Sequence, residues 1–132
     1  MLEDHVRAFL DEPRFAVLAT IAEDGVPHQT VMWYALEDDT IIMNTARGRV
    51  KDKHVQRDRR VSFCVEDGYR YVTVTGQVEL NDDQEVAQAD IAMLARRYEP
   101  GKAERMIQNF QRQKRISMYL RVEQIIASGF DE

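Results

Sequence analysis

The sequence contains a single cysteine, Cys64, in 132 residues, so no disulfide can form within the chain and no cysteine-rich metal site is present. Cys64 lies in the apolar run 61–65, where we expect an inert thiol packed in the core. Histidine is also scarce: His5, His28 and His54 are far apart in the sequence, and no pair has the spacing of a metal site. We therefore expect no bound metal.

Several common motifs are missing as well. There is no G-x-S-x-G, no P-loop and no G-x-G-x-x-G, so a hydrolase nucleophile elbow and the standard nucleotide-binding loops are not supported. No apolar run is long enough to span a bilayer. Residues 1–5 are acidic and do not resemble a secretory signal, so we expect a cytoplasmic protein with no membrane partner.

Positive charge is in the minority. The chain has 18 Lys and Arg against 23 Asp and Glu, which gives a formal net charge of −5. Nucleic-acid binding needs a broad basic face, so we expect no nucleic-acid partner. Hydrophobic residues make up 44% of the chain, and this length and composition predict a single domain, residues 1–132, around one core.

Apolar runs and two-residue alternation predict most of the structure as strands. The predicted strands are 15–21, 27–36, 40–44, 61–65, 69–80 and 116–122. The first is almost continuously apolar and is expected to be covered on both faces. Gly76 within the fifth predicts a bulge or a sharp bend.

Helical spacing of apolar residues predicts helices over 2–11, 47–57, 82–98 and 102–115. The connections at 22–26, 37–39 and 66–68 are too short for the crossovers that parallel strands require. The fold class is therefore mainly β with peripheral helices, built as a small Greek-key barrel. The sequence leaves open whether the two helices after residue 81 cover a site or only pad the barrel.

The most informative segment is a basic one in this acidic chain. Residues 47–60 carry seven cations against two carboxylates, namely Arg47, Arg49, Lys51, Lys53, Arg57, Arg59 and Arg60 against Asp52 and Asp58. The segment follows a predicted strand through the small-residue turn 44–46 and enters a helix. Helix starts present unpaired N–H groups, so this pattern predicts a site for a phosphate-bearing ligand.

These segments together resemble the pyridoxamine 5′-phosphate oxidase-like, FMN-binding split β-barrel superfamily, and within it the deazaflavin (coenzyme F-420)-dependent reductases. The resemblance covers roughly residues 9–130. It is carried by the order and spacing of Phe15-Ala16-Val17-Leu18-Ala19-Thr20, Asp24-Gly25-x-Pro27-His28, Val31-Met32-Trp33-Tyr34, Asn44-Thr45-Ala46-Arg47-Gly48-Arg49-x-Lys51 and Arg57-Asp58-x-Arg60-Val61-Ser62. It implies a homodimeric split barrel with two cofactor sites at the subunit interface.

The resemblance also implies the site residues. The end of the third strand and the following turn would hold the cofactor phosphate with Asn44, Thr45, Ala46, Arg49 and Lys51. Physical chemistry agrees, because an arginine can donate two parallel hydrogen bonds to a phosphate and a lysine adds a point charge. Candidates beside the cofactor ring are His28, Val31, Met32 and Trp33. Tyr69 and Tyr71 are candidates for contact from the partner subunit, and no catalytic residue is assigned.

The function that follows is that of an oxidoreductase, which uses reduced coenzyme F-420 to transfer hydride to a small conjugated substrate. Lys53 and Arg57 favour this cofactor, since its anionic tail is the longer one. The alternatives are an FMN-dependent pyridoxamine 5′-phosphate oxidase-like protein, or a non-enzymatic protein that binds a flavin or a tetrapyrrole. The sequence names neither the substrate nor the proton donor.

Overall fold

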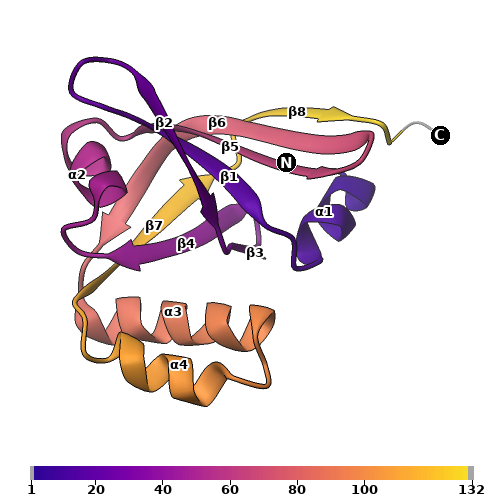
Figure 1. The fold of residues 1–132 in the computed structure, drawn as a ribbon. Coiled ribbons are helices and arrows are strands. Elements are labelled where there is room, and N and C mark those ends of the chain that lie inside the picture. Colours follow the sequence, from indigo (N-terminus) through magenta and orange to yellow (C-terminus); the bar gives the residue numbers. More distant parts are fainter. Residues whose placement is uncertain (1, 131–132) are drawn as a thin grey trace.

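A computed structural model describes residues 2–130 of the chain, and its strands all pair antiparallel (Figure 1). The sheet has the order β2-β1-β5-β6-β7-β4-β3, and β8 pairs with β6 off this path. The strands are β1 (Ala16–Ile21), β2 (Pro27–Met32), β3 (Ala35–Glu37), β4 (Thr40–Ala46), β5 (Arg60–Asp67), β6 (Arg70–Asn81), β7 (Arg115–Arg121) and β8 (Gln124–Ser128).

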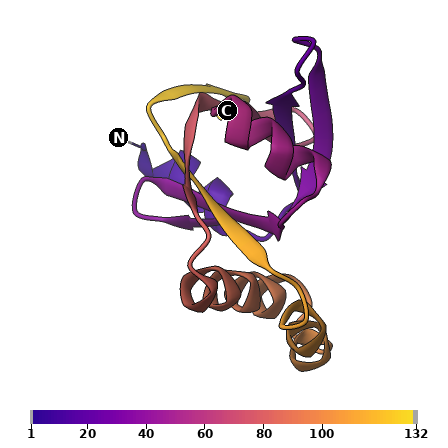
Figure 2. The same ribbon diagram turned by 90° about the vertical axis from the view of Figure 1, so that its left-hand side faces the viewer.

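The sheet curls into a split barrel, which confirms the predicted fold class. Its end strands β2 and β3 do not pair with each other but are joined by residues 33–34, so the barrel is open along this seam. The interior is filled by alternate strand residues such as Leu18, Phe63, Val74 and Met118. Figure 2 shows the sheet wrapped around this interior.

The helices are α1 (Asp4–Asp11), α2 (Val50–Arg57), α3 (Gln84–Tyr98) and α4 (Ala103–Phe110). Leu10 of α1 and Val55 of α2 are fully buried in the barrel core. These two helices lie at opposite ends of the barrel, whereas α3 and α4 lie side by side outside it, next to β4 and β7 (Figure 1). As a result β4 is buried on both faces, by the core on one side and by α3 on the other.

Several boundaries differ from the predictions for physical reasons. The basic helix begins at Val50 instead of residue 47, because Gly48 turns the chain with a φ of 89°. The fourth helix ends at Phe110, and β8 was missed since its residues are mostly exposed and show no alternation. At Gly76 the pairing of β5 with β6 continues without an inserted residue, so no bulge forms there. Instead, β6 exchanges its other neighbour near this point, from β8 to β7.

The burial of residues in β1 and β5 also differs from the sequence predictions. β1 is covered on one face only in the single chain, because Ala16 and Leu18 are buried while Val17 is 37% exposed. Cys64 pairs with Val17 in the register and lies on the same outward face, where it is half-buried. The expectation of a core thiol was therefore wrong, because a strand's alternation places every second residue outside.

The predicted strand 27–36 is broken at Trp33 and Tyr34. Tyr34 leaves the sheet because its ring is buried against Phe63, and its backbone N–H donates to the hydroxyl of Tyr98 at 3.1 Å. The same hydroxyl donates to the carbonyl of Arg14 at 2.5 Å. Trp33 stacks on the Tyr98 ring with a centroid distance of 5.3 Å, so α3 holds both sides of the break.

None of the helices within residues 2–130 combines the length and the apolarity needed to cross a bilayer. The cytoplasmic location stays a prediction.

We expect Tyr98→Phe to lower the free energy of unfolding by about 1–2 kcal/mol, because the amide of Tyr34 and the carbonyl of Arg14 both lose a partner while the ring stays. Urea denaturation measures this change. Tyr69→Phe is the matched control, since Tyr69 is 96% exposed. Equal stabilities for the two variants would show that the Tyr98 hydroxyl does not hold the chain break.

Candidate functional site

A pocket of about 220 Å³ lies where the ends of β2 and β4, the start of α2 and the α3–α4 pair meet. It brings together most of the residues assigned from the sequence, namely Val31, Met32, Trp33, Asn44, Thr45, Ala46, Arg49 and Lys51. These residues come from three segments that are separate in the sequence. The fold thus places these residues side by side, and their role in holding a cofactor stays a prediction.

The cationic end of the pocket has a third member that the sequence did not reveal. Arg115, the first residue of β7, lines the pocket beside Arg49 and Lys51 and is only 6% exposed. Among residues 2–130 no carboxylate lies within ion-pair distance of these three side chains. The nearest signal in the sequence was a basic residue directly before the predicted strand 116–122, which is too common to identify a site.

Burial and neighbouring cations disfavour the charged forms of Lys51 and Arg115. Burial lowers the pKa of Lys51 from its usual range, and Arg49 and Arg115 lower it further. Burial likewise lowers the pKa of Arg115, to about 10, with a further contribution from Arg49. Burial and like charges both disfavour the charged form, so an anion placed among these groups would relieve an existing cost.

The turn that carries Arg49 is held by a buried carboxylate. Asp52, in the first turn of α2, is 2% exposed and accepts hydrogen bonds from Gly48 N at 2.7 Å, Arg47 Nε at 3.1 Å and Gln56 Nε2 at 3.1 Å. Arg47 also pairs with Asp82 at 2.7 Å and does not line the pocket. Arg47 therefore holds the turn in place.

Asn44 is buried beneath the cationic end, and its amide is fully engaged. Its Nδ2 donates to the carbonyl of Ala87 at 2.9 Å and to Ser117 Oγ at 3.2 Å, while its Oδ1 accepts from Arg115 Nε at 3.0 Å. Arg115 also donates to Gln113 Oε1 at 2.6 Å, and its guanidinium lies over the ring of Phe110. Asn44 thus supports the guanidinium of Arg115 from below.

The rest of the pocket lining is mainly apolar. Trp33 and Val31 come from the broken end of β2, whereas Ile91 and Leu94 come from α3 and Phe110 from α4. The two helices after residue 81 therefore cover the site, which the sequence had left open. Apolar side chains beside a group of cations suit a ligand with a flat ring and an anionic tail.

Three predicted residues do not line this pocket. His28, at the start of β2, lies with its ring 5.5 Å from the ring of His54. Tyr69 is at the β5–β6 turn, and Tyr71 is 39% exposed on the outward face of β6. Their assignments to the ring and to the partner subunit stay predictions.

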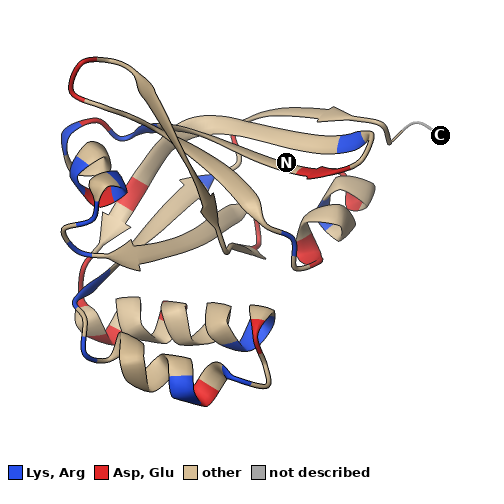
Figure 3. Ribbon diagram, viewed as in Figure 1, with Lys and Arg blue, Asp and Glu red and all other residues tan. Residues whose placement is uncertain are grey.

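The rest of the basic segment has other contacts. Arg57 donates to the carbonyl of Ile21 at 2.6 Å, Arg60 pairs with Asp58 at 2.8 Å, and Lys53 is exposed. Figure 3 shows the basic residues on α2 and on the loops around it. Only Arg49 and Lys51 of this segment reach the pocket.

The described residues contain no group of three or more His, Cys, Asp or Glu side chains that could hold a metal ion. His28 and His54 are neighbours, but His54 is engaged with the hydroxyl of Thr20 at 2.8 Å. Burial, with His28 and Arg57 nearby, lowers the pKa of His54 from its usual range.

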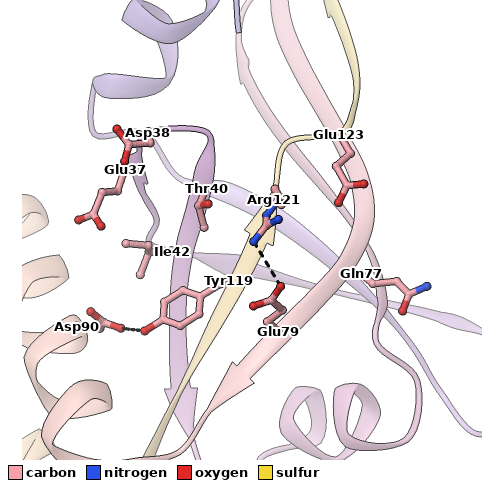
Figure 4. Close-up of a pocket in the computed structure, with 10 residues that line it drawn as sticks. All are labelled: Glu37, Asp38, Thr40, Ile42, Gln77, Glu79, Asp90, Tyr119, Arg121 and Glu123. Carbon is pink, nitrogen blue, oxygen red and sulfur yellow. Dashed lines mark hydrogen bonds and ion pairs between the residues drawn. The ribbon is translucent and has the colours of Figure 1, made fainter. Parts of the chain in front are cut away.

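A larger pocket of about 380 Å³ lies over β3, β4, β6 and β7 (Figure 4). Its carboxylates are Glu37, Asp38, Glu79, Asp90 and Glu123, whereas Arg121 is its single cation and lies 3.6 Å from Glu79. Although it has more room, this acidic pocket would repel a phosphate. The smaller, cationic pocket is the better candidate for the functional site.

Comparison with known proteins gives a consistent result. The chain matches the family model described as "Pyridoxamine 5'-phosphate oxidase" over residues 2–125. A relative, the F-420H(2)-dependent biliverdin reductase of Mycobacterium tuberculosis (strain CDC 1551 / Oshkosh), is 27% identical over 99 residues, which cover 74% of this chain and 72% of the relative.

Solved structures show the same fold. A conserved hypothetical protein from Mycobacterium tuberculosis superposes with a TM-score of 0.83 and 29% identity, over 97% of this chain and 84% of the other. A structure described as an F-420 reductase has a TM-score of 0.77 and 23% identity, over 95% of this chain and 98% of the other.

The hydrogen bonds to Asp52 predict a pH-dependent contribution to stability. Burial alone would raise the pKa of this carboxyl, but the bonds from Gly48, Gln56 and Arg47 outweigh it and hold the pKa below the usual 3.8. A lowered pKa stabilises the fold above the usual value, and this contribution is lost as the pH falls through the lowered one. Asp52→Asn should therefore cost about 1–3 kcal/mol at pH 7 and progressively less below about pH 4.

Urea denaturation at a series of pH values measures the difference between wild type and variant. Asp11→Asn is the control, because Asp11 is exposed, and it should change stability by no more than about 0.5 kcal/mol at any pH. A constant difference for Asp52→Asn from pH 7 to pH 3 would contradict the role of its charge.

Proposed function

Because the chain belongs to the pyridoxamine 5′-phosphate oxidase family, we propose that it is an oxidoreductase that binds a flavin-type cofactor in the cationic pocket. The favoured cofactor is reduced coenzyme F-420, with hydride delivered to a small conjugated substrate. The observation that carries this proposal is the group Arg49, Lys51 and Arg115, gathered without a carboxylate partner beside an apolar wall.

The residues present fit such a cofactor. Arg49 and Lys51 would hold its phosphate from the start of α2, where the first N–H groups of the helix add to the attraction for an anion. Arg115 would hold it from the side of β7. Trp33 and Phe110 belong to the wall that would exclude water from the ring.

A bound flavin or deazaflavin supplies the hydride chemistry itself. The protein's own part is to orient the ring, to neutralise the tail and to keep water away. No side chain is assigned as the proton donor. Tyr98 is excluded from this role by its position, because its hydroxyl is engaged with Arg14 and Tyr34 at the chain break.

The choice of F-420 over FMN rests on the proteins that this chain resembles and on the longer anionic tail of F-420. An F-420H(2)-dependent biliverdin reductase and an F-420 reductase are among the proteins similar to this chain. Of the two extra cations predicted to suit the longer tail, Lys53 is exposed on α2, whereas Arg57 is tied to the carbonyl of Ile21. FMN remains the alternative cofactor, since the phosphate-binding residues would serve both.

A non-enzymatic protein that stores a flavin or a tetrapyrrole is the alternative from another class. An assay with reduced F-420 and biliverdin, the substrate named for the relative, distinguishes the oxidoreductase from the storage protein. Catalytic oxidation of F-420 supports the oxidoreductase. Tight retention of either molecule with no turnover supports storage.

We expect Lys51→Glu to weaken cofactor binding by about 10- to 100-fold, because it replaces one charge-assisted contact with a repulsion. Lys102→Glu is the matched control: it makes the same charge change at an exposed position outside the pocket. Fluorescence titrations with F-420 and FMN, run side by side, measure both affinities. Equal losses in the two variants would remove the phosphate assignment, and tight FMN binding with no response to F-420 would change the cofactor.

We further propose that the chain forms a homodimer through the outward face of its sheet, with the cofactor site at the interface. The register aligns Val31, Val17, Cys64, Thr73 and Ile126 in one row across β2, β1, β5, β6 and β8. Val31 and Ile126 are 66% and 63% exposed, and Val31 also lines the pocket. A second copy packed on this row would therefore lie against the pocket's edge, and Tyr71 on the same face could reach it.

Val17→Lys should shift the protein from dimer to monomer, because it places a charge within this mainly apolar row. Sedimentation velocity measures the mass in solution. Val26→Lys is the control, since Val26 is 57% exposed in the β1–β2 turn and away from the row. A wild-type monomer, or a Val17→Lys dimer of unchanged stability, would argue against this interface.

A further inference from the structure

A chain of hydrogen bonds leads from the cationic pocket to the acidic one. Arg115 Nε donates to Asn44 Oδ1 at 3.0 Å, and Asn44 Nδ2 donates to Ser117 Oγ at 3.2 Å. Ser117 Oγ then donates to Asp90 Oδ2 at 2.6 Å. Asp90 lies on α3 and lines the acidic pocket, where Figure 4 shows its contact with Tyr119.

All three bonds run in the same direction. A carboxylate only accepts, so the single hydroxyl proton of Ser117 is committed to Asp90 and its oxygen must accept from Asn44. The carbonyl of Ala87, which also only accepts, fixes the same orientation of the Asn44 amide. The dipoles therefore align head to tail from the cation to the carboxylate, an arrangement in which hydrogen bonds strengthen one another.

We propose that Asp90 is a positioning residue for the cationic pocket, acting through Ser117 and Asn44 as the remote counter-ion that holds Arg115 toward the ligand. The proposal deepens the proposed function, because it rests on the pocket being a site for a phosphate group. Asp90 does not touch the ligand. It orients the buried guanidinium through two neutral side chains, on the face of β4 and β7 that α3 covers.

The reason for placing the carboxylate at a distance is the competition for donors. A carboxylate in direct contact would take up the guanidinium N–H groups and exclude an anionic ligand. Arg47 illustrates this case nearby, because it pairs directly with Asp52 and Asp82 and lies outside the pocket. Two neutral side chains between Arg115 and Asp90 leave the outer edge of the guanidinium available.

Charged groups surround both ends of this chain of bonds, and at the acidic end the pocket also contains Glu37, Asp38, Glu79, Arg121 and Glu123. Arg49 and Lys51 face Arg115 in the pocket. At the other end, Tyr119 donates to the same Asp90 oxygen at 2.6 Å, and Glu37 is close to Tyr119. Burial and the bond to Asp90 raise the pKa of Tyr119 to about 12, so this hydroxyl keeps its proton at neutral pH.

Inorganic phosphate is the probe for the test, because it reports on the anion pocket without the flavin ring. The melting temperature of each variant is followed against phosphate concentration at constant ionic strength, set with sodium chloride. Asp90→Asn should raise the dissociation constant for phosphate about tenfold, which corresponds to the loss of one good hydrogen bond. Ser117→Ala should have a similar effect, since it breaks the chain while keeping the carboxylate. Tyr119→Phe, which removes the other donor to Asp90, should leave phosphate affinity within about twofold.

A double-mutant test distinguishes the positioning of Arg115 by Asp90 from a purely structural role of Asp90. In an Arg115→Met background, Asp90→Asn should cause no further loss of phosphate affinity, because the group through which it acts is gone. The Nε–H resonance of Arg115, identified by its loss in Arg115→Met, should also move in Asp90→Asn and stay in place in Tyr119→Phe.

Additive effects of Asp90→Asn and Arg115→Met would overturn the proposal. Unchanged phosphate affinity in both Asp90→Asn and Ser117→Ala would do so as well, as would a wild-type protein that phosphate does not stabilise. A phosphate response that follows the expected pattern, in a protein that binds neither F-420 nor FMN, would refute the proposed function and leave this inference standing.

Discussion

The repulsion among Arg49, Lys51 and Arg115 is the interaction on which the rest of the site depends. Like charges in a half-buried pocket raise the free energy of the empty protein, so the surrounding structure must hold them. Asp52 holds the turn before α2, and Asn44 holds the guanidinium of Arg115. The restraints leave the ligand-facing side free. Because these charges are already held together in the empty pocket, an anion that binds there pays little of the cost of arranging them.

The barrel makes such restraint possible because the site is attached to elements that cannot easily move. β4 is buried on both faces along its length, and it delivers Asn44, Thr45 and Ala46 to the pocket. Gly48, which has a positive φ, and the break at Trp33 and Tyr34 lie where strands end. The sheet therefore fixes the positions of the pocket residues that it carries, whereas the segments at the strand ends shape the pocket to the ligand.

Local patterns predicted the mainly β fold, the antiparallel pairing and the segment around Arg49 and Lys51, because each depends on neighbours in the sequence. They did not predict Arg115 or the chain from Asn44 to Asp90, since these contacts join β4, β7 and α3 across the fold. The break at Tyr34 was missed for the same reason: its cause is the hydroxyl of Tyr98, on a helix far along the chain. The outward position of Cys64 shows that an apolar run alone does not say which face is buried.

The α3–α4 pair enters and leaves the barrel at adjacent points, because Asn81 at the end of β6 pairs with Ser117 in β7. In the topology of the sheet the two helices are one elaborated hairpin connection. Its length can change without altering any strand register, since long insertions between fixed neighbours cost little closure entropy. Yet this connection supplies Ile91, Leu94 and Phe110 to the pocket. Changes in this connection can thus alter the apolar side of the pocket, and with it the ring systems that the pocket can accommodate, while the barrel and the anion site stay constant.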